Sequence, residues 1–581
     1  MLALDPKNDG YADRWVIDYN IYETEESGNV IYEDYEKDKR SKPPVYEKEN
    51  GAAAENVNVW VGMSSVSDSA VMQDTILYLK KYIPNMGIVS FQGYPEENSN
   101  SDFFRENNIP VMIQNFGTDY ADYIEENDAW EYSYRHIPMN SEDNQKLSGT
   151  GHAFALPHSA VREMFGRVIK SAAKSGYSSF GYADCVWDWG AYGKAGYNNQ
   201  TVKAFSEDLC GTDDGLKING EKFGFWDYFS YYTGGEALQP QNFGFNSWEE
   251  YQPIDFEEWQ RRTRLGISTD YDYAIMDMLC HYELLKFMQF IGDRAAENGI
   301  KPQIMVNAEF FPNGVDLLFL NRLNNMYFTD EEFFGDTDFL DGAYYRRDYL
   351  IKNAKENAIN AGGVMEAGGG GNAGAYYEPE IAYASAAELG LLGTVEHLEA
   401  DFLYPNRLDF ISNIPAMRTR DESILSYAMG FDLGKSLDLK KRKSDFACIS
   451  SRVHLKQWSY SSEYKPWSSR LDFDDNQDFL LSKMGYNFDG ISQEGISDLE
   501  LPKTVVYAPK VATQAYFEKL LNLNKSGAVK NVIMSVGRIE KTVTANMKLE
   551  SFTEKNPDFD FETVAADLKG GLIKDASGKF V

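Results

Sequence analysis

The stretch from Val364 to Asn372 reads VMEAGGGGN and places one carboxylate, Glu366, between an apolar run and four consecutive glycines. Glycines permit positive φ and let a chain clear a bound molecule, or they can form a nest of N–H groups for an anion. Glu366 directly upstream would repel a doubly charged phosphate. The sequence therefore favours a roomy loop that clears a bound molecule over a phosphate nest.

Acidic residues also follow other short apolar runs, and they outnumber basic residues there. These acids are Asp188, Glu309, Asp330, Glu366, Glu396 and Glu399. No Gly-x-Ser-x-Gly or Cys/His arrangement is present, which argues against a nucleophilic triad. Glycoside hydrolysis needs one carboxylic acid to protonate the departing oxygen, and a second carboxylate to attack the anomeric carbon or to activate water.

A rhythm of short apolar run, polar loop and helical pattern begins at residue 56 and indicates eight strands. The runs are 56–63, 86–91, 109–114, 179–186, 302–306, 325–329, 363–365 and 391–395. The clearest helix spans 271–298, where apolar residues recur at helical spacing and Asn298-Gly299 ends the pattern. Eight strand and helix alternations predict a (β/α)₈ TIM barrel over residues 56–435.

Two further regions are predicted around this barrel, and a third precedes it. An aromatic-rich insertion at about 210–260 is expected to form a wall of the cleft at the carboxyl face. Apolar runs at 446–450, 503–508 and 529–534, with helices near 477–484 and 514–523, predict a smaller parallel α/β domain over 440–581. Residues 1–55 show little periodicity and are interpreted as an extension or accessory segment.

Composition limits the classes of partner. A net charge of −34 should repel nucleic acid and anionic membranes, and no apolar run approaches the length of a membrane span. Four widely spaced cysteines and six histidines predict neither a structural metal site nor a disulfide framework, and no cofactor is expected. The 38 Tyr, 35 Phe and 10 Trp residues suit carbohydrate binding, although most such rings must pack in the core.

Residues from about 86 to 410 resemble glycoside hydrolase family 42, the β-galactosidase-like (β/α)₈ enzymes. The matching segments, in order, are VWDWG at 186–190, TVKAFSEDL at 201–209, FGFNSWEEY at 243–251, IMVN at 304–307, FTD at 328–330, VME at 364–366 and the run 387–395. The resemblance implies that Glu366 is the nucleophile and Asp188 the general acid/base. It also implies that 440–581 is a flavodoxin-like domain that mediates trimerisation or dimerisation.

The sequence departs from this family at the acid/base position. Trp187-Asp188 replaces an Asn-Glu pair, so the carboxyl group is shorter by one methylene and must approach more closely or act through water. The cysteine cluster that binds zinc in some members is absent. The remaining residues expected to bind substrate are Trp187, Trp189, Asn307, Glu309, Asp330, His397 and Arg407.

The sequence therefore predicts a retaining glycosidase acting on β-linked galactose-type saccharides. Arg346, Arg347 and Arg407 could pair with sulfate, so carrageenan-type galactans are one expected substrate class. Two alternatives stay open: a non-catalytic carbohydrate-binding barrel, and a lyase acting on an acidic glycan. The acidic composition suits a periplasmic or secreted enzyme, with no leader visible, and a cytoplasmic location is also left open.

Overall fold

The structure is a computed structural model of the 581-residue chain. It describes residues 59–62, 73, 76–77, 80, 86–90, 101–107, 109–115, 121–140, 154–177, 179–182, 196–267, 269–306, 319, 322–323, 328–330, 366–367, 396–399, 429–430, 433–434, 436–437, 444, 446–450, 488–497, 500–507, 509, 511–534, 541–543 and 549–557. The predicted segment 1–55 and the helix predicted at 477–484 lie outside these residues.

Eight parallel strands form the main sheet, in the order β8-β7-β4-β3-β2-β1-β10-β9. In chain order this is 6-5-4-3-2-1-8-7, the neighbour order of a (β/α)₈ barrel opened between its sixth and seventh strands. The predicted TIM-barrel topology is thus confirmed. The strands are β1 (Val59–Gly62), β2 (Met86–Ser90), β3 (Val111–Asn115), β4 (Ser179–Tyr182), β7 (Lys301–Val306), β8 (Phe328–Asp330), β9 (Glu366–Ala367) and β10 (Glu396–Glu399).

The strand register agrees with a closed barrel. With Gly62 of β1 as the reference, the aligned position can be followed through β2, β3, β4 and β7 to β8. On β8, Asp330 lies five positions beyond the position aligned with Gly62. Followed the other way through β10, the register places Glu366 two positions before Gly62, so Asp330 and Glu366 differ by seven positions across the sheet. A barrel of this type closes with a shear of 8, which leaves the two residues one position apart on adjacent strands.

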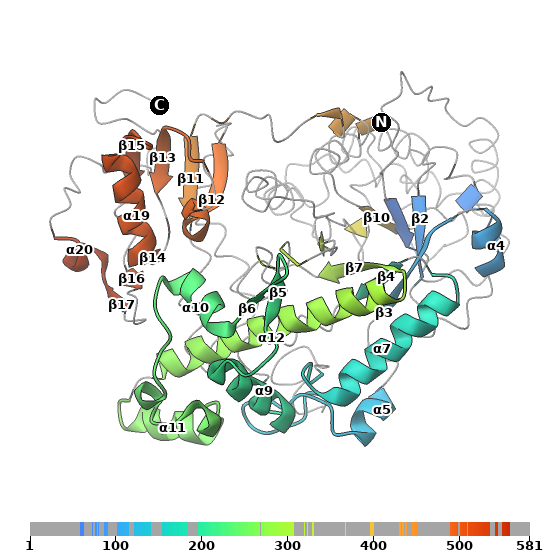
Figure 1. Cartoon of the computed structure of the whole chain (residues 1–581), viewed down its shortest axis with the longest axis horizontal. Coiled ribbons are helices and arrows are strands. Elements are labelled where there is room, and N and C mark those ends of the chain that lie inside the picture. Colours follow the sequence, from blue (N-terminus) through green and yellow to red (C-terminus); the bar gives the residue numbers. More distant parts are fainter. Residues whose placement is uncertain are drawn as a thin grey trace, which may run out of the picture.

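Helices precede and follow the strands on the described part of the chain. They are α4 (Ser101–Glu106), α5 (Ala121–Glu126), α7 (Ser159–Lys174) and the 28-residue α12 (Asp270–Glu297). Figure 1 shows α12 crossing the lower half of the molecule beside α7. The prediction of a helix over 271–298 is confirmed to within one residue at each end. None of these described helices is both long and apolar enough to span a membrane.

The predicted insertion lies between β4 and β7 and is built of short elements. These are α9 (Asn199–Cys210), the hairpin β5 (Leu216–Ile218) and β6 (Glu221–Phe223), α10 (Phe225–Thr233), the 3₁₀ turns Pro240–Phe243 and Trp248–Glu250, and α11 (Phe256–Arg264). Tyr228 is fully buried, with its ring 5.1 Å from Phe319 and 5.8 Å from Tyr282 of α12. Phe225, Phe229, Tyr232, Phe243, Trp248 and Tyr251 are buried as well, so these aromatic rings of the insertion lie in the core.

A buried cluster of charges fixes this insertion to α12. Lys286 Nζ lies 2.5 Å from Asp208 of α9, 2.5 Å from Glu283 and 3.4 Å from Asp213. Arg162 of α7 lies 3.9 Å from the second oxygen of Glu283. Burial and the Glu283 charge raise the pKa of Asp208 well above its usual value. Burial opposes ionisation of Glu283 as well, but Lys286, Asp208 and Arg162 together lower its pKa.

We expect Asp208 to carry a proton that it shares with Glu283. Asp208→Asn keeps one acceptor for Lys286 and one donor for Glu283, so it should change the free energy of unfolding by less than about 1 kcal/mol at pH 7. Glu283→Gln removes an ionised partner of Lys286 and should cost about 3 kcal/mol. Urea unfolding of the two variants measures this difference, and equal losses would contradict the shared proton.

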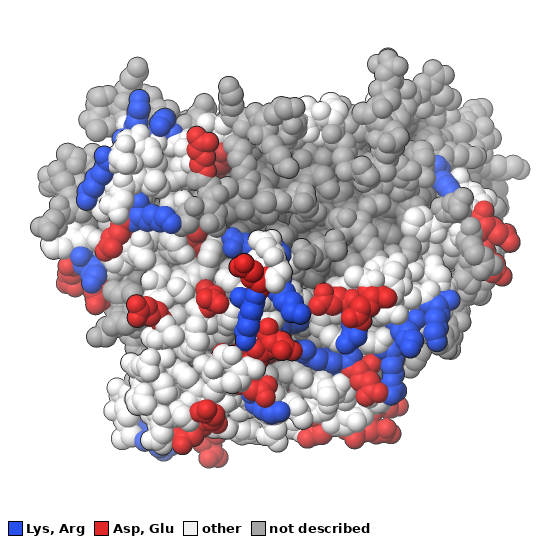
Figure 2. Space-filling model, viewed as in Figure 1, with Lys and Arg blue, Asp and Glu red and all other residues white. Residues whose placement is uncertain are grey.

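On the face seen in Figure 2, acidic and basic side chains are interleaved. Exposed pairs of opposite charge lie within single helices, such as Arg167 with Glu163 on α7 and Arg294 with Glu297 on α12. The described part of this face thus carries both signs, although the whole chain has a net charge of −34.

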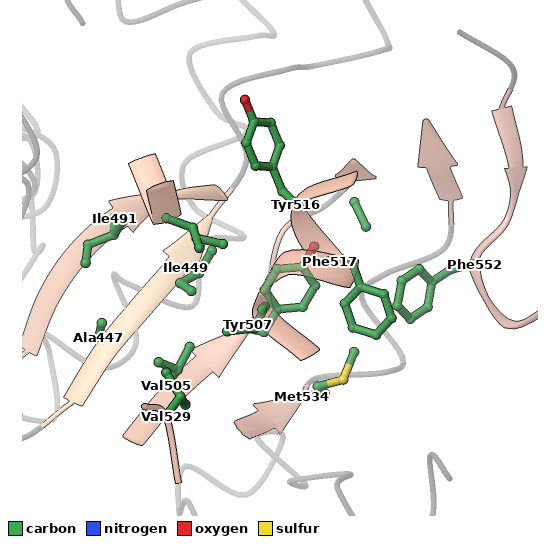
Figure 3. Packing of buried hydrophobic residues seen from close by; sticks show 13 residues of the cluster. Ala447, Ile449, Ile491, Val505, Tyr507, Tyr516, Phe517, Val529, Met534 and Phe552 are labelled. Atoms are coloured by element: carbon green, nitrogen blue, oxygen red, sulfur yellow. The ribbon is translucent and has the colours of Figure 1, made fainter. Parts of the chain in front are cut away.

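A second parallel sheet, with the order β12-β11-β13-β15, forms near the C-terminus. Its strands are β11 (Phe446–Ser450), β12 (Phe488–Ser492), β13 (Thr504–Tyr507) and β15 (Asn531–Met534). Helix α19 (Gln514–Lys525) packs on it through Phe517, whose ring lies 5.5 Å from Tyr507 and 5.0 Å from Phe552 (Figure 3). β14 (Val511–Thr513), β16 (Lys541–Val543) and β17 (Leu549–Ser551) form a third sheet, and α20 (Phe552–Lys555) follows it.

The insertion also contacts the second sheet's helix. The Tyr516 hydroxyl at the start of α19 donates a hydrogen bond to the carbonyl of Tyr231 in α10. Gly234, which ends α10 with φ +63°, lies so close to Ala515 that an added Cβ would sit 2.4 Å from the Ala515 Cβ. Close packing therefore joins α10 to α19.

We expect Gly234→Ala to weaken this contact. Gly244 is a matched control, because it also ends a helical turn at positive φ (83°) but has no atom within 4 Å of an added Cβ. Gly244→Ala should cost about 1 kcal/mol of backbone strain. Gly234→Ala should cost about 1–3 kcal/mol more because of the clash. Urea denaturation of both variants tests this, and equal losses would argue against tight packing of α10 on α19.

Candidate active site

Polar residues meet at the carboxyl edge of the barrel. Glu366 of β9 is in register with His397 of β10, and Glu399 is in register with Gly62 of β1. Backbones in register on adjacent strands lie about 4.8 Å apart. The structure thus brings together the backbones of Glu366 and His397, two of the residues predicted from sequence.

Alternation along the strands divides the barrel residues into two faces of the sheet. The register assigns one set of apolar positions to a single face: Val61, Ile88, Ile113, Phe180 and Ile304. The opposite face holds the positions of Gln114, Gln303, Glu366, His397 and Glu399. Glu396 shares the first face, and Trp60, Val89 and Met305 share the second.

Asp330 ends β8 and is in register with Val306, the residue before Asn307. Val306 lies two positions after Ile304, so alternation assigns Asp330 to the apolar set. The register therefore supports the pairing of Glu366 with His397 more directly than a substrate contact by Asp330, which stays a prediction.

The other predicted site residues lie outside the described part of the chain. They are Asp188, Trp187, Trp189, Asn307, Glu309 and Arg407. β4 ends at Tyr182, so Asp188 follows it by six residues, and Asn307 directly follows β7. Their roles stay predictions from the sequence.

Four strands continue beyond their predicted ends, and β8 does so by one residue, to Asp330. β9 and β10 contain Glu366 and Glu396–Glu399, whereas the predicted strands end at residues 365 and 395. β3 extends to Asn115, in register with Tyr182, one residue beyond the predicted end. Apolar runs mark only the buried length of a strand, and the parallel ladder continues into polar residues at the carboxyl edge. Asn115 is thus a strand-end polar residue that the apolar pattern missed.

Within the described residues, no group of three or more His, Cys, Asp or Glu side chains is arranged to hold a metal ion. One acidic group of this part, Asp208 with Asp213 and Glu283, surrounds the ammonium of Lys286.

Comparison with solved structures supports the architecture. The β-galactosidase from the psychrophilic Marinomonas ef1 matches with a TM-score of 0.51 and 9% identity over 85% of this chain and 77% of its own. The β-galactosidase from Bacillus circulans sp. alkalophilus matches with a TM-score of 0.51 and 12% identity over 84% and 72%. No protein-family model and no curated protein matches the sequence. The chain is therefore a TIM-barrel protein, and its resemblance to β-galactosidase-like enzymes is confirmed at the level of fold.

Proposed function

We propose that the protein is a glycosidase that cleaves β-linked galactose-type saccharides with retention of configuration. The observation that carries this proposal is the position of Glu366, in register with His397 at the carboxyl edge of the barrel. Active sites of TIM-barrel enzymes lie at this edge. Two of the similar solved structures are β-galactosidases, which supports the choice of substrate class.

The proposed reaction has two displacement steps. The carboxylate of Glu366 attacks the anomeric carbon while Asp188 gives its proton to the departing oxygen, so the glycosidic bond breaks and a glycosyl ester forms. Asp188, now ionised, then takes a proton from water, and the water oxygen displaces Glu366. Retention requires the two carboxyl groups to lie about 5–5.5 Å apart.

The remaining predicted residues would recognise the sugar. Trp187 and Trp189 would stack on its C–H face, while Asn307, Glu309 and His397 would hold its hydroxyl groups. Arg407 would pair with a sulfate ester if the substrate is a carrageenan-type galactan.

We also propose that the C-terminal sheet belongs to a flavodoxin-like domain through which the chain forms a dimer or trimer. In chain order its strands lie 2-1-3-4, which matches the first four strands of the flavodoxin-like order. An acidic chain of this composition suits a periplasmic or secreted enzyme.

A screen of aryl β-glycosides and galactan oligosaccharides, with proton NMR of the first-formed anomer, tests the function. We expect release of galactose first as the β-anomer. Saturable sugar binding without any product would favour the carbohydrate-binding alternative. Products with the absorbance of an unsaturated uronate would instead identify a lyase.

A further inference from the structure

Helix α12 is longer than the strand that it precedes. Its 28 residues span about 42 Å, whereas the six residues of β7 span about 20 Å. The helix ends at Glu297 and β7 begins at Lys301, so the two run antiparallel from the amino edge of the barrel. The first half of α12 therefore extends past the carboxyl end of β7 (Figure 1).

Contacts identify two faces of this helix. Tyr282 faces the β5–β6 hairpin, because its hydroxyl donates to the carbonyl of Phe223 at 2.8 Å. Glu283, about 100° further round, faces Arg162 of α7 at 3.9 Å. Helix α12 also packs against β7. We infer that its third face makes this contact, because the other two face the hairpin and α7. This face is fully buried in the second half of the helix and consists of Leu284, Met288, Ile291 and Ala295.

Asp277 and His281 continue this barrel-facing stripe at three- and four-residue spacing. Asp277 precedes Glu297 by 20 residues, or about 30 Å of helix, so it lies about 10 Å beyond the end of β7. The stripe thus changes from apolar to ionisable where the helix passes the strand ends.

The two side chains face each other, with His281 Nε2 3.8 Å from Asp277 Oδ2. His281 is fully enclosed, whereas 15% of the Asp277 side chain is accessible. Asp277 can therefore touch a bound molecule while His281 lies behind it. Burial raises the pKa of Asp277 to about 6, although His281 opposes this rise.

We propose that Asp277 accepts a hydrogen bond from a hydroxyl of the leaving-group sugar, and that His281 is a positioning residue for it. This rests on the proposed glycosidase function. A group about 10 Å beyond the strand ends is too far from the reacting bond for the chemical step, but it suits the next sugar unit of an oligosaccharide.

The experiment compares two substrates, a β-linked galactose disaccharide and 4-nitrophenyl β-galactoside, which lacks the second sugar. Asp277→Asn should lower kcat/KM for the disaccharide about 10- to 100-fold and leave the aryl galactoside within about twofold of wild type. His281→Gln should show a smaller loss of the same pattern, mainly in KM. Asp293→Asn, on the hairpin side of α12 and near Lys217, is the matched control and should change neither rate. Equal losses on both substrates, or no loss on either, would overturn the proposal.

If wild type hydrolyses neither substrate, the proposed function fails, and thermal unfolding decides the role of Asp277. Because the pKa of Asp277 is raised in the folded protein, ionisation of this carboxyl group lowers the free energy of unfolding as pH rises through about 6. If Asp277 is a binding carboxylate, its buried charge lowers the stability of the protein at pH 8. Asp277→Asn should then have an unchanged or higher Tm at that pH. A Tm below that of Asp293→Asn would make the pair purely structural and overturn the inference.

Discussion

Glu366→Gln should lower kcat by a factor of at least about 10⁴ while leaving the Tm within about one degree of wild type. Glutamine keeps the size of the side chain but cannot act as a nucleophile toward the anomeric carbon. The measurement is steady-state hydrolysis of an aryl β-galactoside, with thermal unfolding of the same preparation.

Two further variants make this result specific. Asp188→Asn should lose about 10²–10⁴-fold, because it removes general acid/base catalysis. Its loss should be smallest on an aryl substrate whose leaving group needs no proton. Asp330→Asn, on the opposite face of the sheet by register, should lose far less than Glu366→Gln. Comparable losses at Asp330 and Glu366 would contradict the assignment of faces.

The largest effect on stability is expected for Lys286→Met. The substitution keeps the apolar stem but leaves three buried carboxyl groups, those of Asp208, Asp213 and Glu283, without their central ammonium. Breaking a buried ion pair in this way costs about 3–5 kcal/mol. Urea unfolding followed by tryptophan fluorescence should show this loss in the transition of the barrel.

Lys203→Met is the control, because Lys203 forms an exposed pair with Glu207 at 3.5 Å on α9. Exposed pairs of this kind are worth at most about 1 kcal/mol. The loss for Lys286→Met should shrink at acidic pH, since protonation of the carboxyl groups removes the uncompensated charge. A loss at position 286 no larger than at position 203 would show that the cluster does not fix the insertion.

The barrel was predictable because its strands are buried on both faces and appear as short apolar runs separated by helical patterns. β1, β2, β7 and α12 could be located in this way. β10 has the polar sequence Glu396-His397-Leu398-Glu399, so the apolar pattern predicts this strand at 391–395, before its actual start. β12 reads Phe-Asp-Gly-Ile-Ser and was not predicted, because an acid and a glycine interrupt its apolar pattern although the strand is buried.

The arrangement of the candidate site was only partly predictable. The apolar run before Glu366 indicated a strand-end acid, but its register with His397 depends on pairing between strands 31 residues apart in the sequence. The Lys286 cluster joins residues from α7, α9 and α12, and no spacing in the sequence links them. The role inferred for Asp277 depends on how far α12 extends beyond β7, which requires the lengths of both elements.

Trapping the covalent intermediate tests the central claim most directly. A 2-deoxy-2-fluoro-β-galactoside with an activated leaving group slows the second step, so a retaining enzyme accumulates the glycosyl ester and can be digested and sequenced by mass spectrometry. We predict one fluorogalactosyl group, attached to Glu366. A label on another carboxylate, or turnover of galactosides with no label at all, would contradict the account.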